Sequence, residues 1–197
     1  MKTLVRNIGL LAGVGTELRK EGAAMSEVAS IKDAWLLIDG ESIAAFGPMA
    51  DGLPAGADET IDAAGRMVIP AFCDSHTHAV WAGSREREFE DKIRGLSYAE
   101  IAANGGGILN SADLLHDTSE DELFEQSLAR ISEMMAAGSG AIEIKSGYGL
   151  STADELKMLR VIRRIKESVP AVVKATFLGG HALARGMSRE DYVRLVC

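Results

Sequence analysis

The chain has 197 residues, of which 47% are hydrophobic and 25% are charged, and these proportions argue against an intrinsically disordered protein. Its formal net charge of −8 argues against the basic surface that nucleic acid or an anionic membrane would require. Two cysteines, Cys73 and Cys197, are too few for a disulfide framework and favour the reducing cytoplasm.

The first third of the chain predicts β structure. Its opening stretch, "MKTLVRNIGLLAGVG", is interpreted as a strand, because no small-residue cleavage site of a signal peptide follows before a charged segment. The stretch "AWLLIDGESIAAFG" predicts a hairpin, because two apolar runs meet at the turn pair Asp39-Gly40.

From residue 67 onward, predicted strands alternate with predicted helices. "RMVIPAFCDSH" contains a short apolar run typical of a buried strand. Residues 119–137 then predict a helix that Ser119 and Glu122 open as a capping box and that Gly138 ends. Its expected apolar face consists of Leu123, Phe124, Leu128, Ile131 and Met135.

The same alternation continues to the last residue. "AIEIKS" predicts a strand, and Thr152 with Glu155 predicts the capped start of a helix that Pro170 ends. Its expected apolar face consists of Leu156, Leu159, Ile162 and Ile165. "AVVKATFLGG" predicts a third strand, and Ser188 begins a further helix. This order indicates parallel strands with right-handed crossovers, as in a (β/α)₈ barrel, whose active site lies at the C-terminal ends of its strands.

Two histidines follow the first of these strands. His76 and His78 are expected to point the same way, because side chains alternate along a strand, so both imidazoles can reach one divalent ion. Asp74 shares their parity, whereas Cys73 has the opposite parity and is expected to be a buried free thiol. The alternative to a metal site is a pair of surface or hydrogen-bonding histidines.

Three further candidates lie near the strand ends. Arg85 can hold a substrate carboxylate, although a solvated charge is the simpler interpretation of its run, "SREREFEDK". Tyr148 stands between two glycines, where it either reaches a ligand or caps a turn. His181 ends the third strand, and a lone histidine is more often structural. His116 is interpreted as a solvated side chain.

Two other features receive structural interpretations. Glu143 and Lys145 share a parity along their strand, so we expect an ion pair inside the barrel. "NGGGILNSA" lacks the following Lys-Ser/Thr of a phosphate-binding loop and is interpreted as a flexible loop.

"DAAGRMVIPAFCDSHTH" resembles the entry to the barrel in the amidohydrolase superfamily, in which a His-x-His ends the first strand; Ala71 replaces the usual Gly. "SHTHAVWAGSREREFEDKIRGLSYAEIAANGGGILNSA", "AIEIKSGYGLSTADELKMLRVIRRIK" and "KATFLGGHAL" are similar to the imidazolonepropionase family within it. The resemblance implies an α/β fold, with the first three strands of an amidohydrolase-type (β/α)₈ barrel at residues 67–197. Part of a small β-sandwich domain is expected at residues 1–66.

The resemblance also implies a chemistry. The reaction is metal-dependent hydrolysis of the cyclic amide of 4-imidazolone-5-propanoate to N-formimidoyl-L-glutamate, with one divalent ion, zinc or iron. His76 and His78 match the family's metal ligands, and Arg85, Tyr148 and His181 match positions that contact the substrate. The general base and the remaining ligands are expected beyond Cys197. The family resemblance further suggests a homodimer for the full-length enzyme.

Two alternatives stay open. Another cyclic amidohydrolase or a deaminase of the same superfamily is the nearest, although "EIKSGYGL" and "GGGILNSA" disfavour it. The other is a non-catalytic truncated fragment, in which the exposed edges of a three-stranded sheet would make the chain unstable or prone to aggregate. Such a fragment is expected to show no turnover and to bind metal weakly.

Overall fold

The computed structural model describes residues 1–197, apart from the side chain of Ala102. The chain divides into two compact units, Met1–Pro70 and Ala71–Cys197. None of the helices in the described part of the chain has the length and apolar character that crossing a bilayer requires.

The first unit is built on a five-stranded mixed sheet. Its elements are β1 (Lys2–Ala12), η1 (Gly22–Ser26), β2 (Ser30–Asp39), β3 (Ser42–Pro48), η2 (Met49–Asp51), β4 (Glu59–Asp62) and β5 (Met67–Val68). β1 pairs antiparallel with β2 and parallel with β4 and β5, and β3 pairs antiparallel with β2. The predicted opening strand and the hairpin at Asp39-Gly40 are therefore confirmed; Gly40 adopts a φ of 59° in the turn.

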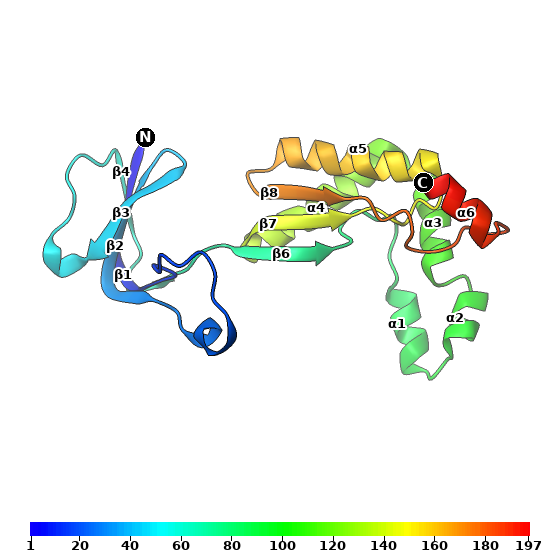
Figure 1. Ribbon diagram of the computed structural model, residues 1–197, viewed down its shortest axis with the longest axis horizontal. Helices are drawn as coiled ribbons and strands as arrows, with labels where there is room; N and C mark the ends of the chain where they lie inside the picture. Colours follow the sequence, from blue (N-terminus) through cyan, green and yellow to red (C-terminus); the bar gives the residue numbers. More distant parts are fainter. The chain divides into compact units, whose positions relative to one another are not determined.

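The second unit is an α/β structure around a three-stranded sheet with the order β6-β7-β8. Both strand pairs are parallel, as the alternation of strands and helices predicts. Helices α4 and α5 lie along this sheet, while α1 and α2 form a separate pair (Figure 1). The elements are β6 (Phe72–Thr77), α1 (Glu86–Ile93), α2 (Tyr98–Ala103), α3 (Ile108–Asp117), α4 (Glu120–Ala136), β7 (Ser139–Lys145), α5 (Thr152–Ser168), β8 (Val172–Thr176) and α6 (Arg189–Val196).

The main core of the second unit lies between the sheet and the two long helices. Alternate residues of β7, Ile142 and Ile144, are buried against α4 and α5, as expected for a strand with one face covered by helices. The helices contribute apolar residues at helical spacing, which are Leu123, Ile131, Met158, Val161, Ile162 and Ile165. This packing fixes β7 between its neighbours, so the loops that follow the three strands emerge from a rigid base.

The helix starts follow local sequence signals closely. Ser119 and Ser188 are N-caps as predicted, and each hydroxyl accepts a backbone N–H three residues later. For α5 the predicted cap is wrong by one residue, because Ser151 rather than Thr152 accepts the N–H of Asp154. Glu155 consequently does not close a capping box.

The glycine-rich stretch before α3 is more ordered than expected. The flexible-loop interpretation of "NGGGILNSA" is wrong from Ile108 onward, where α3 begins. Gly107 caps this helix with a φ of 85°, and its N–H donates to the Glu88 carboxylate at 2.8 Å. That bond anchors the loop, which explains why a glycine-rich segment leads directly into a regular helix.

Candidate active site

Side chains from three strand ends meet at one edge of the parallel sheet. His78 follows β6, Tyr148 follows β7 and His181 follows β8. The ring of His78 stacks on that of His181, with centroids 4.8 Å apart and an interplanar angle of 24°. The Tyr148 ring lies 5.2 Å from His78 and 5.3 Å from His181. Parallel strands bring their C-terminal ends to the same edge, which is why residues over 100 positions apart form one cluster.

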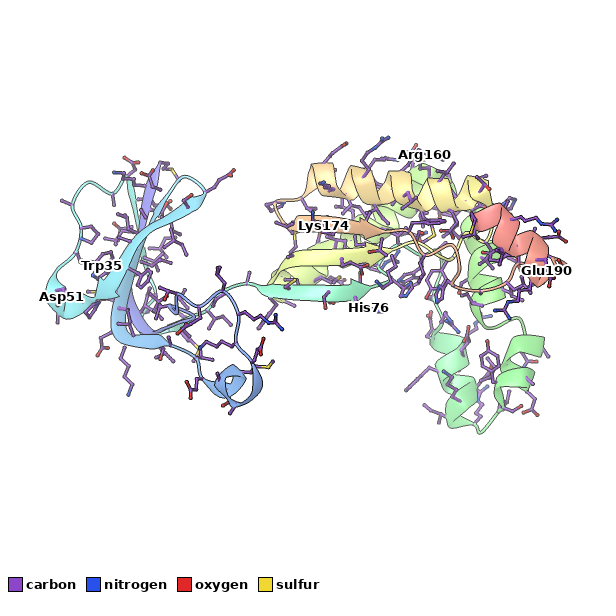
Figure 2. The ribbon with its side chains drawn as sticks, viewed as in Figure 1. Trp35, Asp51, His76, Arg160, Lys174 and Glu190 are labelled. Carbon is purple, nitrogen blue, oxygen red and sulfur yellow. The ribbon has the colours of Figure 1, made fainter. Side chains whose placement is uncertain are left out.

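His76 lies on β6 (Figure 2), and its ring centroid is 5.7 Å from that of His78. The register of β6 against β7 shifts between Asp74 and Thr77. Asp74 pairs with Ile142 and Thr77 pairs with Ile144, so β6 has one residue more than β7 between these two pairs. Such a bulge reverses the alternation of side chains along the strand. Asp74 therefore does not share the face of the histidines, and that prediction is wrong.

The same bulge explains the environment of Cys73. This cysteine is free, as predicted, but it is exposed rather than buried. It pairs with Ala141, so it lies on the opposite face of the sheet from Ile142 and the core under the helices. The expectation of a buried thiol is wrong because the strand does not keep one parity throughout its length.

Two imidazole nitrogens at the centre of the cluster are buried without a partner. Nδ1 of His78 and Nδ1 of His181 accept or donate no hydrogen bond within the described part of the chain. Burial, and then the neighbouring His181 and His76, lower the pKa of His78 below its ordinary value of 6.5. A neutral imidazole with an unused buried nitrogen is in the state that binds a metal ion.

The residues present fit two of the ligands of a divalent ion. One ion with metal–nitrogen bonds of about 2.0–2.1 Å can bridge imidazoles at the separation of His76 and His78. Among the described residues, no group of three His, Cys, Asp or Glu side chains converges closely enough to form a larger ligand set. The histidine pair by itself therefore does not complete the coordination of a metal ion.

Arg85 lies at the N-terminus of α1 and forms a two-pronged ion pair with Glu88. Its Nε donates to Oε1 at 2.7 Å, and its Nη2 donates to Oε2. This pairing raises the pKa of Arg85 and lowers that of Glu88. Arg85 is exposed, as a solvated charge would be, with 43% of its side chain accessible, but the buried Glu88 carboxylate also holds its guanidinium. Among the described residues, its remaining N–H donors have no acceptor.

A cavity of about 350 Å³ lies beside the ring cluster. It is lined by His78, Trp81, Arg85, Ser111 and Tyr148. Three of the five predicted site residues therefore line one cavity, His181 stacks against its wall, and His76 adjoins it through His78. Its volume is in the range of small-molecule sites.

Arg130 of α4 fixes the segment that carries the cavity wall. Its Nε donates to the carbonyl of Ala79 at 3.0 Å, and its Nη2 donates to the carbonyl of Trp81. The guanidinium also lies over the Trp81 ring, 4.0 Å from the centroid. Arg130 thus holds Trp81, which lines the cavity.

The loops after β7 and β8 are joined by Ser146. Its N–H donates to the carbonyl of Thr176, and its hydroxyl accepts the N–H of Leu178 at 3.0 Å. Gly147 has a φ of 111°, and a Cβ there would lie 2.9 Å from the Cβ of His181. Glycine at this position permits the contact between the two loops.

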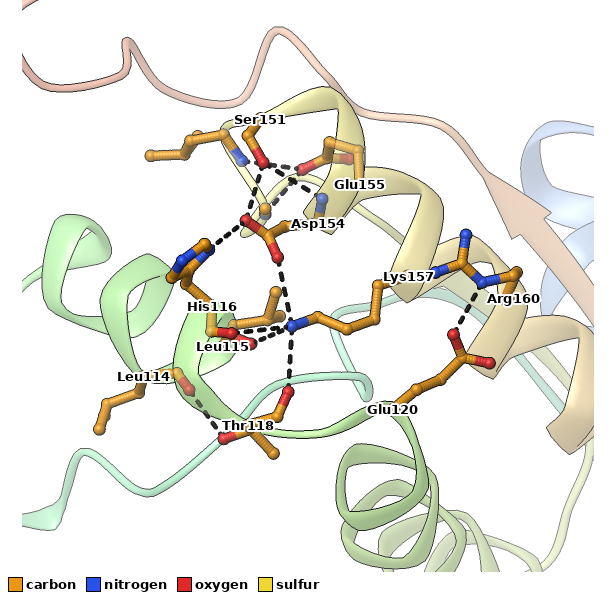
Figure 3. A network of polar contacts seen from close by, with 12 residues as sticks. Leu114, Leu115, His116, Thr118, Glu120, Ser151, Asp154, Glu155, Lys157 and Arg160 are labelled. Atoms are coloured by element: carbon orange, nitrogen blue, oxygen red, sulfur yellow. Dashed lines mark hydrogen bonds and ion pairs between the residues drawn. The ribbon is translucent and has the colours of Figure 1, made fainter.

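The other predicted features are placed outside the cluster. Glu143 and Lys145 form the expected ion pair at 2.6 Å, with both side chains largely buried. His116 is 72% exposed, in agreement with its solvated interpretation, but its Nδ1 also lies 2.9 Å from the Asp154 carboxylate (Figure 3).

Sequence reasoning missed four side chains that build the site: Trp81, Glu88, Ser111 and Arg130. The helical spacing of Arg85 and Glu88, three residues apart, is a signal that could have paired them. Packing between distant segments brings Trp81 and Ser111 to the cavity and Arg130 to Trp81, and single-sequence patterns do not report such contacts.

No family model matches the chain. Over its whole length it is 54% identical to the imidazolonepropionase of Christiangramia forsetii, of which it covers 49%. It is also 54% identical to the imidazolonepropionase of Flavobacterium johnsoniae, with 92% of this chain and 45% of that protein aligned. Over its whole length the chain is therefore similar in sequence to imidazolonepropionases. It spans about half the length of the curated relatives it matches.

Solved structures with a similar fold belong to the amidohydrolase superfamily. A triazine hydrolase variant aligns with 89% of this chain and 35% of its own, with a TM-score of 0.61 and 19% identity. An atrazine chlorohydrolase from Arthrobacter aurescens TC1, complexed with zinc, covers the same shares with a TM-score of 0.52 and 19% identity. At this level of identity the likeness concerns the fold.

Proposed function

We propose that the protein is a metal-dependent hydrolase that adds water to the cyclic amide of 4-imidazolone-5-propanoate, giving N-formimidoyl-L-glutamate in L-histidine degradation. Homology to the imidazolonepropionases supports this substrate. The structural observation that carries the proposal is the convergence of His78, Tyr148 and His181 beside the cavity that Arg85 lines.

In this proposal His76 and His78 bind one divalent ion, zinc or iron. The buried, unpartnered Nδ1 of His78 supports the assignment, as does the zinc complex of the structurally similar atrazine chlorohydrolase. When bound, a divalent cation supplies Lewis-acid catalysis for the hydrolysis of an amide. The two histidines contribute by being fixed at the end of β6, and burial keeps the pKa of His78 below its ordinary value.

Arg85, Tyr148 and His181 bind and orient the substrate. Arg85 holds the propanoate carboxylate with the N–H donors that Glu88 does not use, and Glu88 keeps the guanidinium in place. The Tyr148 hydroxyl and the His181 imidazole offer hydrogen bonds to the polar atoms of the imidazolone ring. Trp81 supplies a flat apolar wall. Holding both ends of the substrate aligns the scissile amide with the histidine pair.

The finer fold assignment is part of the same proposal. We assign residues 67–197 to the first three strands of an amidohydrolase-type (β/α)₈ barrel and residues 1–66 to part of a small β-sandwich domain. Apolar side chains on both outer strands of the second sheet support a larger barrel, since Phe72 on β6 is 56% exposed and Val172 on β8 is 60% exposed. The free cysteines fit a cytoplasmic location, and the full-length enzyme is proposed to be a homodimer.

A chimera tests the function directly. The 197 residues replace the matching half of the Christiangramia forsetii imidazolonepropionase, and that parent enzyme is the positive control. We expect the chimera to consume 4-imidazolone-5-propanoate and to form a product heavier by one water, followed by mass spectrometry. The double variant H76A/H78A is expected to lose turnover and bound metal together.

The matched control is H116A, which removes a histidine of the same unit outside the ring cluster. It should retain both turnover and metal content. Turnover that persists in H76A/H78A would contradict the metal assignment. A folded, metal-loaded chimera that opens a different cyclic amide, but leaves 4-imidazolone-5-propanoate intact, would contradict the substrate.

A further inference from the structure

Glu155 is a buried carboxylate, only 6% exposed, in the first turn of α5. Backbone N–H groups of the preceding loop surround it. Gly149 donates to Oε1 at 2.7 Å, Leu150 donates to the same oxygen at 3.3 Å, and Gly147 lies within 3.1 Å of both oxygens. One side chain therefore binds three peptide groups of a single short loop.

These three peptide groups bracket Tyr148. Both of its neighbours, Gly147 and Gly149, are fixed to the same carboxylate, so the Cα of Tyr148 has little freedom to move. The loop also packs closely against α5, because a Cβ on Gly149 would lie 2.4 Å from the backbone nitrogen of Glu155. The position of the Tyr148 ring between His78 and His181 is thus set by contacts to its backbone.

The helix itself does not need this carboxylate as a cap. Ser151 is the N-cap of α5, and its hydroxyl accepts the N–H of Asp154 (Figure 3). A capping-box glutamate would return to the N-cap N–H, whereas Glu155 reaches further back, to residues 147, 149 and 150. Burying a carboxylate is costly unless hydrogen bonds compensate it, and here the compensating bonds are all made to the Tyr148 loop.

We propose that Glu155 is a positioning residue for Tyr148, holding the loop of residues 147–150 so that the phenol ring stays against His78 and His181 at the cavity. This inference rests on the proposed function for the role of Tyr148 in binding substrate. The positioning of the loop can be measured without it.

The first test measures the loop in the 197-residue chain by NMR. E155Q preserves the shape of the side chain but replaces charge-assisted hydrogen bonds with neutral ones, so amide hydrogen exchange at Gly147, Gly149 and Leu150 should accelerate about tenfold. The ring resonances of Tyr148 should move toward those of an exposed tyrosine. The control is E167Q, the same change at an exposed glutamate of α5, which should alter neither signal.

The second test asks whether Glu155 acts through Tyr148. The probe is 3-(imidazol-4-yl)propanoate, a stable compound with the ring and carboxylate of the proposed substrate. We expect E155Q to weaken binding of the probe about fivefold to tenfold in the wild-type background and to have no further effect in Y148F. Additive effects of the two substitutions would show that Glu155 has only a general structural role and would overturn the proposal.

The two tests distinguish a failure of the proposed function from a failure of the positioning role of Glu155. A wild-type chain that is folded but does not bind the probe would count against the proposed function, while unchanged exchange and unchanged Tyr148 resonances in E155Q would overturn the positioning role. If E155Q does not fold, as judged by circular dichroism, E155D replaces it. That variant keeps the charge but is one methylene too short, and it should accelerate exchange at the same three amides.

Discussion

His78 and His116 belong to the same compact unit, yet their imidazoles meet opposite environments. His78 is packed among other rings with a buried Nδ1 that has no partner among the described residues, and burial lowers its pKa. His116 is exposed, and its hydrogen bond to Asp154 raises its pKa above the ordinary value of 6.5. The environment of His78 leaves its Nδ1 available to a ligand, whereas that of His116 engages its Nδ1 in a hydrogen bond to Asp154.

The difference teaches how a fold treats polar groups with different tasks. Asp154 joins His116, Ser151 and Lys157 (Figure 3), and the Lys157 ammonium also binds three carbonyls at the end of α3. Each polar group in this network has a partner, so the network holds α3 to α5. An unpartnered buried nitrogen contributes no such stability, so its presence calls for an explanation such as a bound ion.

The largest expected effect concerns metal binding. H78A should abolish saturable zinc binding, because loss of a direct ligand costs more than the roughly 10–100-fold that follows loss of an outer partner. H116A should leave zinc affinity unchanged. Isothermal titration of both variants with zinc measures the contrast, and equal losses in the two would remove the functional distinction between these histidines.

The next effect concerns stability. D154A should lower the free energy of unfolding by about 3 kcal/mol, because it leaves the Lys157 ammonium without its counter-charge. The two side chains are only 8% and 12% exposed, so solvent screens this pair weakly. Urea denaturation measures the change, and D121N, at an exposed carboxylate on α4, is the control. A loss below that of the control would show that the network is not structural.

A third substitution tests the opposite prediction for the ring cluster. H78F keeps an aromatic ring but removes the unpartnered buried nitrogen, so in metal-free buffer it should raise the free energy of unfolding by about 1 kcal/mol. Zinc should then stabilise the wild-type chain and leave H78F unchanged. Denaturation with and without zinc provides the measurement. Destabilisation of H78F as large as that of D154A would mean that His78 is a structural residue.

The smallest effect is a pH dependence of stability. Because the folded-state pKa of His116 is raised, its contribution is fully present below the unfolded value of 6.5 and is lost as pH rises through the higher folded value. Asp154 and Lys157 face the ring from α5, and Asp117 acts from its own helix. The urea midpoint of the wild-type chain should exceed that of H116Q near pH 6, and the difference should vanish at alkaline pH.

Asp154 sets the lower limit of the pH range in which its interaction with His116 stabilises the fold. Burial raises the pKa of this carboxylate, but hydrogen bonds from His116, Ser151 and Lys157 outweigh burial and leave it below 3.8. Its contribution is therefore present above 3.8 and is lost as pH falls through the lower folded value. A difference between wild type and H116Q that grows toward alkaline pH would contradict the assigned direction.

Local signals predicted much of this architecture. Ser119 and Ser188 mark helix starts because an N-cap hydroxyl binds a backbone N–H only three residues later. Asp39-Gly40 marks a hairpin because these two residues favour a tight turn, which is also a local property. The parallel arrangement of β6, β7 and β8 followed from the alternation of predicted strands with predicted helices along the chain. The predicted histidines and Tyr148 do converge, because strand ends of a parallel sheet share an edge.

The errors arise where pairing between distant segments overrides local pattern. Strict alternation predicts that Asp74 shares the face of the histidines and that Cys73 lies on the other face, but a bulge set by the pairing of β6 with β7 reverses that alternation. The spacing of Thr152 and Glu155 predicts a capping box, but the Glu155 carboxylate binds the loop before the helix. The local sequence around Cys73, Asp74 and Glu155 predicts neither the bulge nor the loop conformation, because both depend on contacts with other segments.

The double hydrogen bond of Ser146 has a consequence for motion. Because these bonds link the loop after β7 to the loop after β8, Tyr148 and His181 should move together. Thermal opening of the cavity on this side should then be a concerted movement with a single relaxation rate for both residues. S146A would remove the bond to Leu178 and keep the backbone bond to Thr176, so the movements of Tyr148 and His181 should become less strongly coupled.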